Sequence, residues 1–195
     1  MIALNRARAG ARHHVDGQAP GLVTRTGRRR PDLVRGVAST PQAATPAETV
    51  VAYTDGACIG NPGPGGWGVH ITEPDGSVRE LGGGEPHTTN NRMELRAAIE
   101  AVLATLDAPA VTIVTDSQYV QRGITQWLRG WKRSGWMNSD GKPVKNQDLW
   151  RELDDLADER VTWEWRRAHA GDPGNERAHQ LAYSSARRQA ALSLM

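Results

Sequence analysis

Residues 54–68 read TDGACIGNPGPGGWG, and this stretch decides how the rest of the chain is arranged. An apolar segment from Val50 leads into it, a turn rich in glycine and proline follows, and apolar residues then alternate from Trp67. This pattern predicts a β-hairpin with Asp55 near the middle of its first strand. A carboxylate there is costly to bury alone, and the adjacent glycines let a large ligand approach the backbone. We therefore interpret Asp55 as the central ligand of a metal site.

The chain beyond this hairpin alternates between strand and helix patterns. Further strands are expected at residues 67–73, 78–81, 111–115 and 161–165. Helices are expected up to Pro109, over 117–122, from 125, over 146–157, and after an N-cap at Asp172. Three strands linked by hairpins, followed by strand–helix alternation, indicate an α/β protein with a mixed sheet and helices on both faces.

The composition separates an N-terminal extension from a globular part. Residues 1–47 carry eight Arg against two Asp, contain no aromatic residue and show no apolar periodicity, so we predict a disordered extension. Its composition fits a basic arm that contacts nucleic-acid phosphates, an organellar transit peptide or a passive tail. Residues 48–195 carry 16 basic and 20 acidic groups, and we expect them to form the single catalytic domain.

The apolar runs and the cysteine content of the sequence indicate where in the cell the protein is expected. No apolar run approaches the ~18 residues that a membrane-spanning helix needs. Cys58 is the only cysteine, which suits a reducing compartment. We therefore expect a cytoplasmic protein without membrane contact.

Three acids fall at comparable places along the chain. Asp55 lies within the first strand, Glu94 in the first turn of the first long helix, and Asp116 at the end of strand 111–115. Ligands collect at the carboxyl ends of strands in an open α/β sheet, and crowded carboxylates repel one another unless a cation is present. All-oxygen ligation suits Mg²⁺ or Mn²⁺, and a pair of such ions serves phosphodiester cleavage. This set of acids predicts a nuclease.

Helix capping is the alternative explanation for two of these acids. Asp116 precedes Ser117 and could cap the helix that follows. Glu94 follows Asn91 with the spacing of a capping box. Capping leaves Asp55 unexplained, however, so the three acids together favour metal binding.

Four motifs carry a resemblance to a known family. They read YTDGACIGNPGPGG at 53–66, TTNNRMEL at 88–95, TDSQYV at 115–120, and WEWR at 163–166 with HAG at 169–171. In this order they resemble the motifs of type 1 ribonuclease H, the bacterial ribonuclease HI, over about residues 49–190. The resemblance implies the ribonuclease H-like α/β fold, a five-stranded mixed sheet of order 3-2-1-4-5 with helices on both faces.

The resemblance also implies a function and roles for the acids. The expected activity is endonucleolytic hydrolysis of the RNA strand of RNA–DNA hybrids by two metal ions, which leaves 5′-phosphate and 3′-hydroxyl ends and removes RNA primers and R-loops. Asp55 would bridge both Mg²⁺ ions, and Glu94 and Asp116 would complete the site of the ion at the leaving group. His169 would assist proton transfer or product release, a task that suits an imidazole at neutral pH. We expect a monomer that binds the hybrid.

The chain departs from the family pattern at one position. The motif NERA at 175–178 aligns, but His179 stands where the family usually has a fourth carboxylate. A neutral imidazole can ligate a metal, yet it brings no negative charge and is softer than a carboxylate. We expect His179 to contact the metal site, with weaker Mg²⁺ binding and a relative preference for Mn²⁺. A helix-surface histidine without a role is the alternative.

Neutral residues near the acids resemble the family's contacts to the RNA strand. Asn61, Asn90 and Gln118 match contacts to 2′-hydroxyls and base edges, which a duplex of A-form type presents in its wide minor groove. Thr89 and Asn146 match a pocket for a phosphate of the DNA strand.

Residues 127–145 resemble the basic protrusion with which the family grips the DNA strand. Three Trp alternate there with basic side chains. Trp127 and Trp131 lie four residues apart on one helix face, so we expect them to pack together in the interior. Contacts to DNA are expected from the remaining members, Lys132, Arg133, Trp136 and Lys145.

Two other functions stay open. One is a non-catalytic module that binds hybrids or duplex RNA, in which His179 marks a decayed site. The other is a different nuclease, or a nucleotidyl transferase, of the same fold class. The presence of Asp55, Glu94, Asp116 and His169 argues against decay. The protrusion, together with Asn61, Asn90 and Gln118, favours a hybrid over DNA alone.

Overall fold

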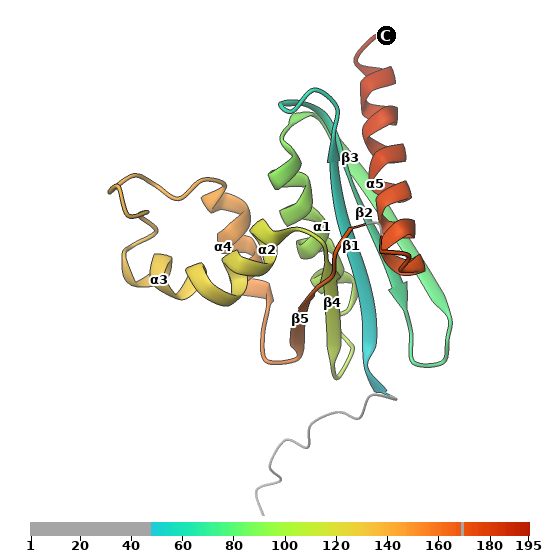
Figure 1. The fold of residues 1–195 in the computed structure, drawn as a ribbon, viewed down its shortest axis with the longest axis horizontal. Helices are drawn as coiled ribbons and strands as arrows, with labels where there is room; N and C mark the ends of the chain where they lie inside the picture. Colours follow the sequence, from blue (N-terminus) through green and yellow to red (C-terminus); the bar gives the residue numbers. More distant parts are fainter. Residues whose placement is uncertain (1–47, 169) are drawn as a thin grey trace, which may run out of the picture. The chain divides into compact units, whose positions relative to one another are not determined.

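The computed structural model describes residues 48–168 and 170–195, and every structural statement below concerns these residues. The predicted extension, residues 1–47, lies outside them. A five-stranded sheet of order β3-β2-β1-β4-β5 forms the centre of the fold (Figure 1). Its strands are β1 (Val50–Cys58), β2 (Gly63–Thr72), β3 (Val78–Thr88), β4 (Val111–Thr115) and β5 (Val161–Trp165). The strand β1 is antiparallel to β2 and parallel to β4, so the predicted mixed sheet and its order are confirmed.

The connections between the strands supply the helices. They are α1 (Asn90–Ala104), α2 (Gln118–Arg122), α3 (Leu128–Arg133), α4 (Gln147–Leu156) and α5 (Pro173–Leu192), with a π-helical turn, η2 (Gly123–Trp127), between α2 and α3. Among the described residues, no helix combines the length and the apolar character needed to cross a bilayer.

Helices cover both faces of the sheet, and glycines set how closely they approach. On one face α1 lies against Gly56, where an added Cβ would be 2.3 Å from the backbone nitrogen of Glu94. On the other face α5 lies against Gly66 and Gly68, where an added Cβ would be 2.3 and 2.4 Å from backbone atoms of α5. Side chains at these positions would push the helices outward. The glycines therefore hold the residues of α1 and α5 directly against β1 and β2.

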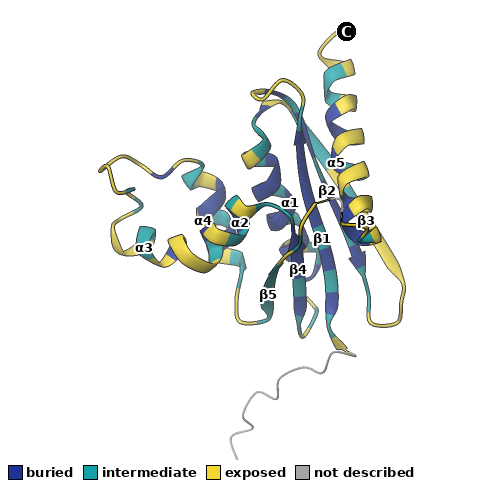
Figure 2. Ribbon diagram, in the orientation of Figure 1, coloured by how far each residue is buried: buried dark blue, intermediate teal, exposed yellow. Residues whose placement is uncertain are grey.

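The main core lies between the sheet, α1 and α4. Leu95, Ile99 and Val102 of α1 are fully buried, as are Trp150 and Leu153 of α4. Burial of each such side chain stabilises the fold by about 1.5–3 kcal/mol. Figure 2 shows the buried residues concentrated along β1, β4 and the inner face of α1, whereas the segment around α3 is largely exposed. The functional protrusion expected at 127–145 is thus built mainly from surface residues.

Two element boundaries differ from the sequence-based predictions. The strand expected at 78–81 continues to Thr88 through three glycines that pair with residues 66–68 of β2. These glycines leave room for neighbours, since the ring of Trp67 lies directly over Gly83. The helix α1 begins at Asn90, with Thr89 as its N-cap, so Glu94 lies in the second turn and the prediction of the first turn was wrong.

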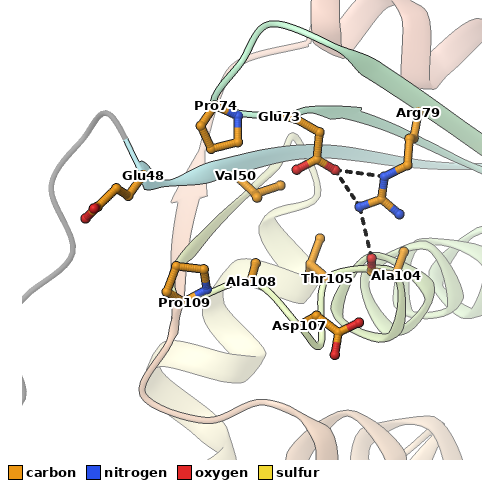
Figure 3. A pocket seen from close by; sticks show the side chains of 10 residues that line it. All are labelled: Glu48, Val50, Glu73, Pro74, Arg79, Ala104, Thr105, Asp107, Ala108 and Pro109. Atoms are coloured by element: carbon orange, nitrogen blue, oxygen red, sulfur yellow. Dashed lines mark hydrogen bonds and ion pairs between the residues drawn. The ribbon is translucent and has the colours of Figure 1, made fainter.

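The end of the sheet where β1 and β4 begin is closed by two arginines. Arg79 pairs with Glu73 and donates to the carbonyl of Ala104 at 3.1 Å (Figure 3). Arg160 donates to three more carbonyls just beyond α1, those of residues 105, 106 and 108. A pocket of about 370 Å³ lies at this end. The carboxylate of Asp116 follows the opposite end of β4, so this pocket is separate from the predicted site.

Candidate active site

The register between β1 and β4 brings two of the acids together. Thr54 and Thr115 are parallel partners, and Asp55 and Asp116 are the residues that follow them. Partners in parallel strands lie side by side, so the two carboxylates start from adjacent points of the sheet. Asp55 is only 4% exposed, whereas Asp116, one residue past the end of β4, is half-buried.

The third acid reaches the site from α1. Gly56, the neighbour of Asp55, has no side chain to keep α1 away, and Glu94 of that helix is 6% exposed. One carboxylate oxygen from each of Asp55, Glu94 and Asp116 lies within 4.8 Å of those of the other two. The structure therefore gathers the three predicted acids into one cluster.

Helix capping does not explain Asp116 or Glu94. The N-cap of α2 is Ser117, whose hydroxyl accepts from the backbone N–H of Val120. The N-cap of α1 is Thr89, which moves Glu94 out of capping-box spacing. Its carboxylate instead accepts from the side-chain amide of Asn90 at 3.2 Å. The capping alternative was wrong for both acids.

Burial and mutual repulsion make the acids difficult to ionise together. Burial, followed by the charge of Asp116, raises the pKa of Asp55 from 3.8 to about 6. Burial, followed by the charges of Asp55 and Asp116, raises the pKa of Glu94 well above its usual value of 4.5. The backbone N–H of Gly56 and the ring of His179 act on Asp55 in the opposite direction.

The same residues fit a divalent cation. Oxygen Oε2 of Glu94 is fully buried, yet it has no hydrogen-bond partner among the described residues. A buried acceptor without a partner is costly unless another group satisfies it. A cation between the three carboxylates would bind this oxygen and remove the repulsion that raises both pKa values. The donors are all hard oxygens, the set that Mg²⁺ and Mn²⁺ prefer.

Helix α5 adds two polar side chains to the cluster. Asp172 caps this helix, as predicted, by accepting from the backbone N–H groups of residues 174 and 175. One turn in, buried Asn175 donates its amide to Asp116 at 3.4 Å. One turn further, Nδ1 of His179 lies 2.7 Å from Oδ2 of Asp55. An ionised carboxylate only accepts, so Nδ1 carries the proton of this bond.

The neutral residues predicted to contact RNA lie beside the acids. The side-chain oxygen of Asn61 accepts from the backbone N–H of Asn90 at 3.0 Å, which ties the hairpin turn to the start of α1. Asn90 in turn contacts Glu94. Gln118 is exposed at the start of α2, two residues after Asp116. Of the three, Asn90 contacts an acid directly, Asn61 is linked to it through Asn90, and Gln118 follows Asp116 in the chain.

The two residues predicted for a phosphate pocket lie at the starts of neighbouring helices. Thr89 is the N-cap of α1, and Asn146 precedes α4 in a left-handed conformation with φ 56°. The side-chain amide of Asn146 donates to the hydroxyl of Tyr119 at 3.2 Å. Arg92 of α1 pairs with Asp148 of α4 through both carboxylate oxygens, at 3.0 and 2.7 Å, and so links the two helix starts.

The side chains of the protrusion, residues 127–145, differ in their exposure and in their contacts. Trp131 packs edge-on against buried Trp150 at 5.4 Å, as expected. Trp127 contacts Trp131 but keeps 36% of its surface exposed, so the prediction that it lies in the interior was wrong. Trp136 is half-buried beneath the guanidinium of Arg151, 5.0 Å from its ring centre. The predicted cations are all exposed, but Lys132 forms an ion pair with Asp154 at 2.8 Å; the other two are Arg133 and Lys145.

Sequence reasoning assigned no role to two residues that contact Asp116. The indole N–H of Trp165 donates to the backbone carbonyl of Asp116 at 2.9 Å, and Asn175 contacts its carboxylate. Trp165 belongs to the motif WEWR and Asn175 to NERA, but only the register of β4 with β5 and the placement of α5 reveal what they contact. His169, predicted to be catalytic, lies outside the described residues.

Comparisons with known proteins agree with this geometry. A family model described as RNase H matches residues 47–187. Ribonuclease HI of Pseudomonas aeruginosa is 58% identical over 139 residues, covering 71% of this chain and 93% of that protein. The ribonuclease H of Thermosynechococcus vestitus is 60% identical over 140 residues, covering 70% of this chain and 88% of that protein.

A solved structure has a fold similar to that of this chain. LC9-RNase H1, described as a type 1 RNase H with the type 2 active-site motif, has a TM-score of 0.66 and 37% sequence identity, over 75% of this chain and 76% of that one. The strand order, the carboxylate cluster and the relatives lead to one assignment. The chain belongs to the ribonuclease H family, among its type 1 bacterial members.

Proposed function

We propose that this enzyme cleaves the RNA strand of RNA–DNA hybrids with two divalent cations and leaves 5′-phosphate and 3′-hydroxyl ends. The observation that carries the proposal is the cluster of Asp55, Glu94 and Asp116, whose carboxylate oxygens lie within 4.8 Å of one another. Bound there, a pair of divalent cations activates a water and stabilises the leaving oxygen of a phosphodiester. Removal of RNA primers and R-loops by a cytoplasmic monomer is the cellular role that we propose.

The three carboxylates have one task in this proposal, which is to hold the cations beside the scissile phosphate. Asp55 is central, because it lies between Asp116 on the neighbouring strand and Glu94 on α1. His169 would transfer a proton or assist product release, as its place in the family motif implies. His179 would act as a further ligand or hold Asp55 from outside, and we propose that its lack of charge weakens Mg²⁺ binding relative to Mn²⁺.

Substrate selection would rest on two sets of side chains, one proposed for each strand of the hybrid. Asn61, Asn90 and Gln118 offer neutral donors and acceptors next to the acids, which suits 2′-hydroxyls in a minor groove. The DNA strand would run over Thr89, Asn146 and the protrusion. There the exposed cations Arg133 and Lys145 contact phosphates, and Lys132 does so in competition with Asp154.

One cleavage experiment tests the proposal. Labelled RNA–DNA hybrid, RNA duplex and DNA duplex are incubated with wild type and Asp55→Asn in Mg²⁺ or Mn²⁺, and the product ends are mapped. We expect wild type to cut only the RNA strand of the hybrid, leaving 5′-phosphates, and Asp55→Asn to be inactive. Asp155→Asn removes an exposed carboxylate of α4 and serves as the control with unchanged activity. Intact RNA in the hybrid with both ions would refute the proposal.

A further inference from the structure

The last residue of β5, Trp165, touches the main chain of one catalytic acid. Its indole N–H donates to the carbonyl of Asp116 at 2.9 Å. Thr115 is its partner in the parallel ladder, and the final ladder bond runs from the N–H of Arg166 to the carbonyl of Thr115 at 3.0 Å. Asp116 therefore lies one residue beyond the point where backbone pairing holds β4.

Asp116 has the weakest backbone support of the three acids, since it lies outside both the sheet ladder and the helices. Asp55 is paired with Gly68 inside the sheet, and Glu94 lies within α1. In the described part of the chain, the carbonyl of Asp116 accepts a hydrogen bond from Trp165 alone. The direction of the Asp116 carboxylate thus depends on Asn175, which donates to it at 3.4 Å, and on the main chain, to which the indole of Trp165 donates.

The surroundings of Trp165 fit a hydrogen-bond donor better than a packing residue. Its side chain is 40% exposed at the edge of the sheet, whereas Trp163, two residues earlier in β5, packs against the main core. An exposed indole gains little from burial. What this side chain supplies is a donor at the edge of the carboxylate cluster.

We propose that Trp165 is a positioning residue, whose indole N–H fixes the backbone of Asp116 and so directs its carboxylate toward Asp55 and Glu94. The inference rests on the proposed role of Asp116 as a metal ligand. Loss of a neutral hydrogen bond changes an equilibrium by about three- to tenfold. We therefore expect the affinity for Mg²⁺ to fall by that factor when the donor is removed.

The variant Trp165→Phe removes the N–H and keeps an aromatic ring, and Trp163→Phe is the matched control in the same strand. Mg²⁺ and Mn²⁺ are titrated into the substrate-free full-length chain and followed by the ¹H–¹⁵N signals of the protein. Each of the seven Trp contributes one indole N–H signal, and the signal of Trp165 is assigned by its loss in Trp165→Phe. The indole N–H signal of Trp165 should exchange slowly with solvent, because this N–H is hydrogen-bonded to Asp116. The same signal should shift when the metal is added.

The outcomes separate the inference from its alternatives. A three- to tenfold weaker Mg²⁺ affinity in Trp165→Phe, with wild-type affinity in Trp163→Phe and an unchanged KM for hybrid, supports positioning. Wild-type metal affinity in Trp165→Phe overturns the inference. So does a raised KM alone, which would mean stacking on the substrate, or an equal loss of affinity in both variants, which would mean a general effect on the fold. If Asp55→Asn binds metal as well as wild type, the metal site itself fails.

Discussion

Asp55→Asn should stabilise the metal-free protein while abolishing activity. The pKa of Asp55 rises from 3.8 to about 6 on folding, because the carboxylate is buried beside Asp116. The folded state therefore holds this proton more tightly than the unfolded chain does. Ionisation costs stability as the pH rises from about 4 to about 6, and the cost remains above that pH. Each pKa unit corresponds to about 1.4 kcal/mol, so the cost of ionising Asp55 in the folded state is about 3 kcal/mol.

The asparagine removes this cost. The pKa of about 6 already includes the hydrogen bond from His179 to the ionised carboxylate, so the loss of that contact is not subtracted again. The gain at pH 7 is then about 3 kcal/mol, or about 6–12 °C in Tm for a domain of this size. At pH 4 the wild-type Asp55 is mostly protonated, so the gain should largely disappear.

Thermal unfolding in EDTA, followed by circular dichroism, measures the difference in Tm between Asp55→Asn and wild type at pH 4 and at pH 7. Asp155→Asn, on the exposed face of α4, should leave Tm unchanged at either pH. Saturating Mg²⁺ should raise the Tm of wild type more than that of Asp55→Asn, because only the wild type keeps its central ligand. A variant no more stable than wild type at pH 7, or equally stabilised at both pH values, would refute the electrostatic reasoning.

Two further predictions concern the neighbours of Asp55. Gly56→Ala would place a Cβ 2.3 Å from the backbone of Glu94, about 1 Å inside normal contact, so we expect a loss of about 1–3 kcal/mol in urea unfolding together with low activity. Gly130→Ala, with open space around the new Cβ, should be neutral or stabilising, and equal losses in both would contradict the packing argument. His179→Asp should lower the half-saturating Mg²⁺ concentration for cleavage severalfold and reduce the preference for Mn²⁺. Identical saturation curves for wild type and variant would contradict a role of His179 in metal binding.

Local patterns were sufficient for most of the architecture. The run VTIVT at 111–115 and the capped start of α5 at Asp172 each carry their signal within a few residues, and both appear as predicted. Asp55 could be singled out because no nearby helix start explained a carboxylate in a strand. The register of Thr54 with Thr115 then brings Asp55 and Asp116 together without further information.

The features that sequence reasoning missed depend on partners far away in the chain. The glycines at 82–84 form a strand because Trp67 and α5 lie over them, although glycine by itself argues against a strand. Trp165 meets a residue 49 positions earlier, and Asn175 meets the same residue across 59 positions. No local periodicity encodes such contacts. They follow only when the register of β5 and the placement of α5 are known.

The contact between His179 and Asp55 supports our proposal that an imidazole takes the place of the carboxylate expected at position 179. A fourth anion would add repulsion against Asp55, whose pKa is already raised by burial and by Asp116. The imidazole instead donates Nδ1–H to Asp55 at 2.7 Å. In the neutral ring this bond leaves the lone pair on Nε2, which is the arrangement that orients histidine ligands in metal sites. We therefore expect His179 to make the metal-free cluster less strained and to offer the cations a neutral nitrogen, at the expense of attraction for Mg²⁺.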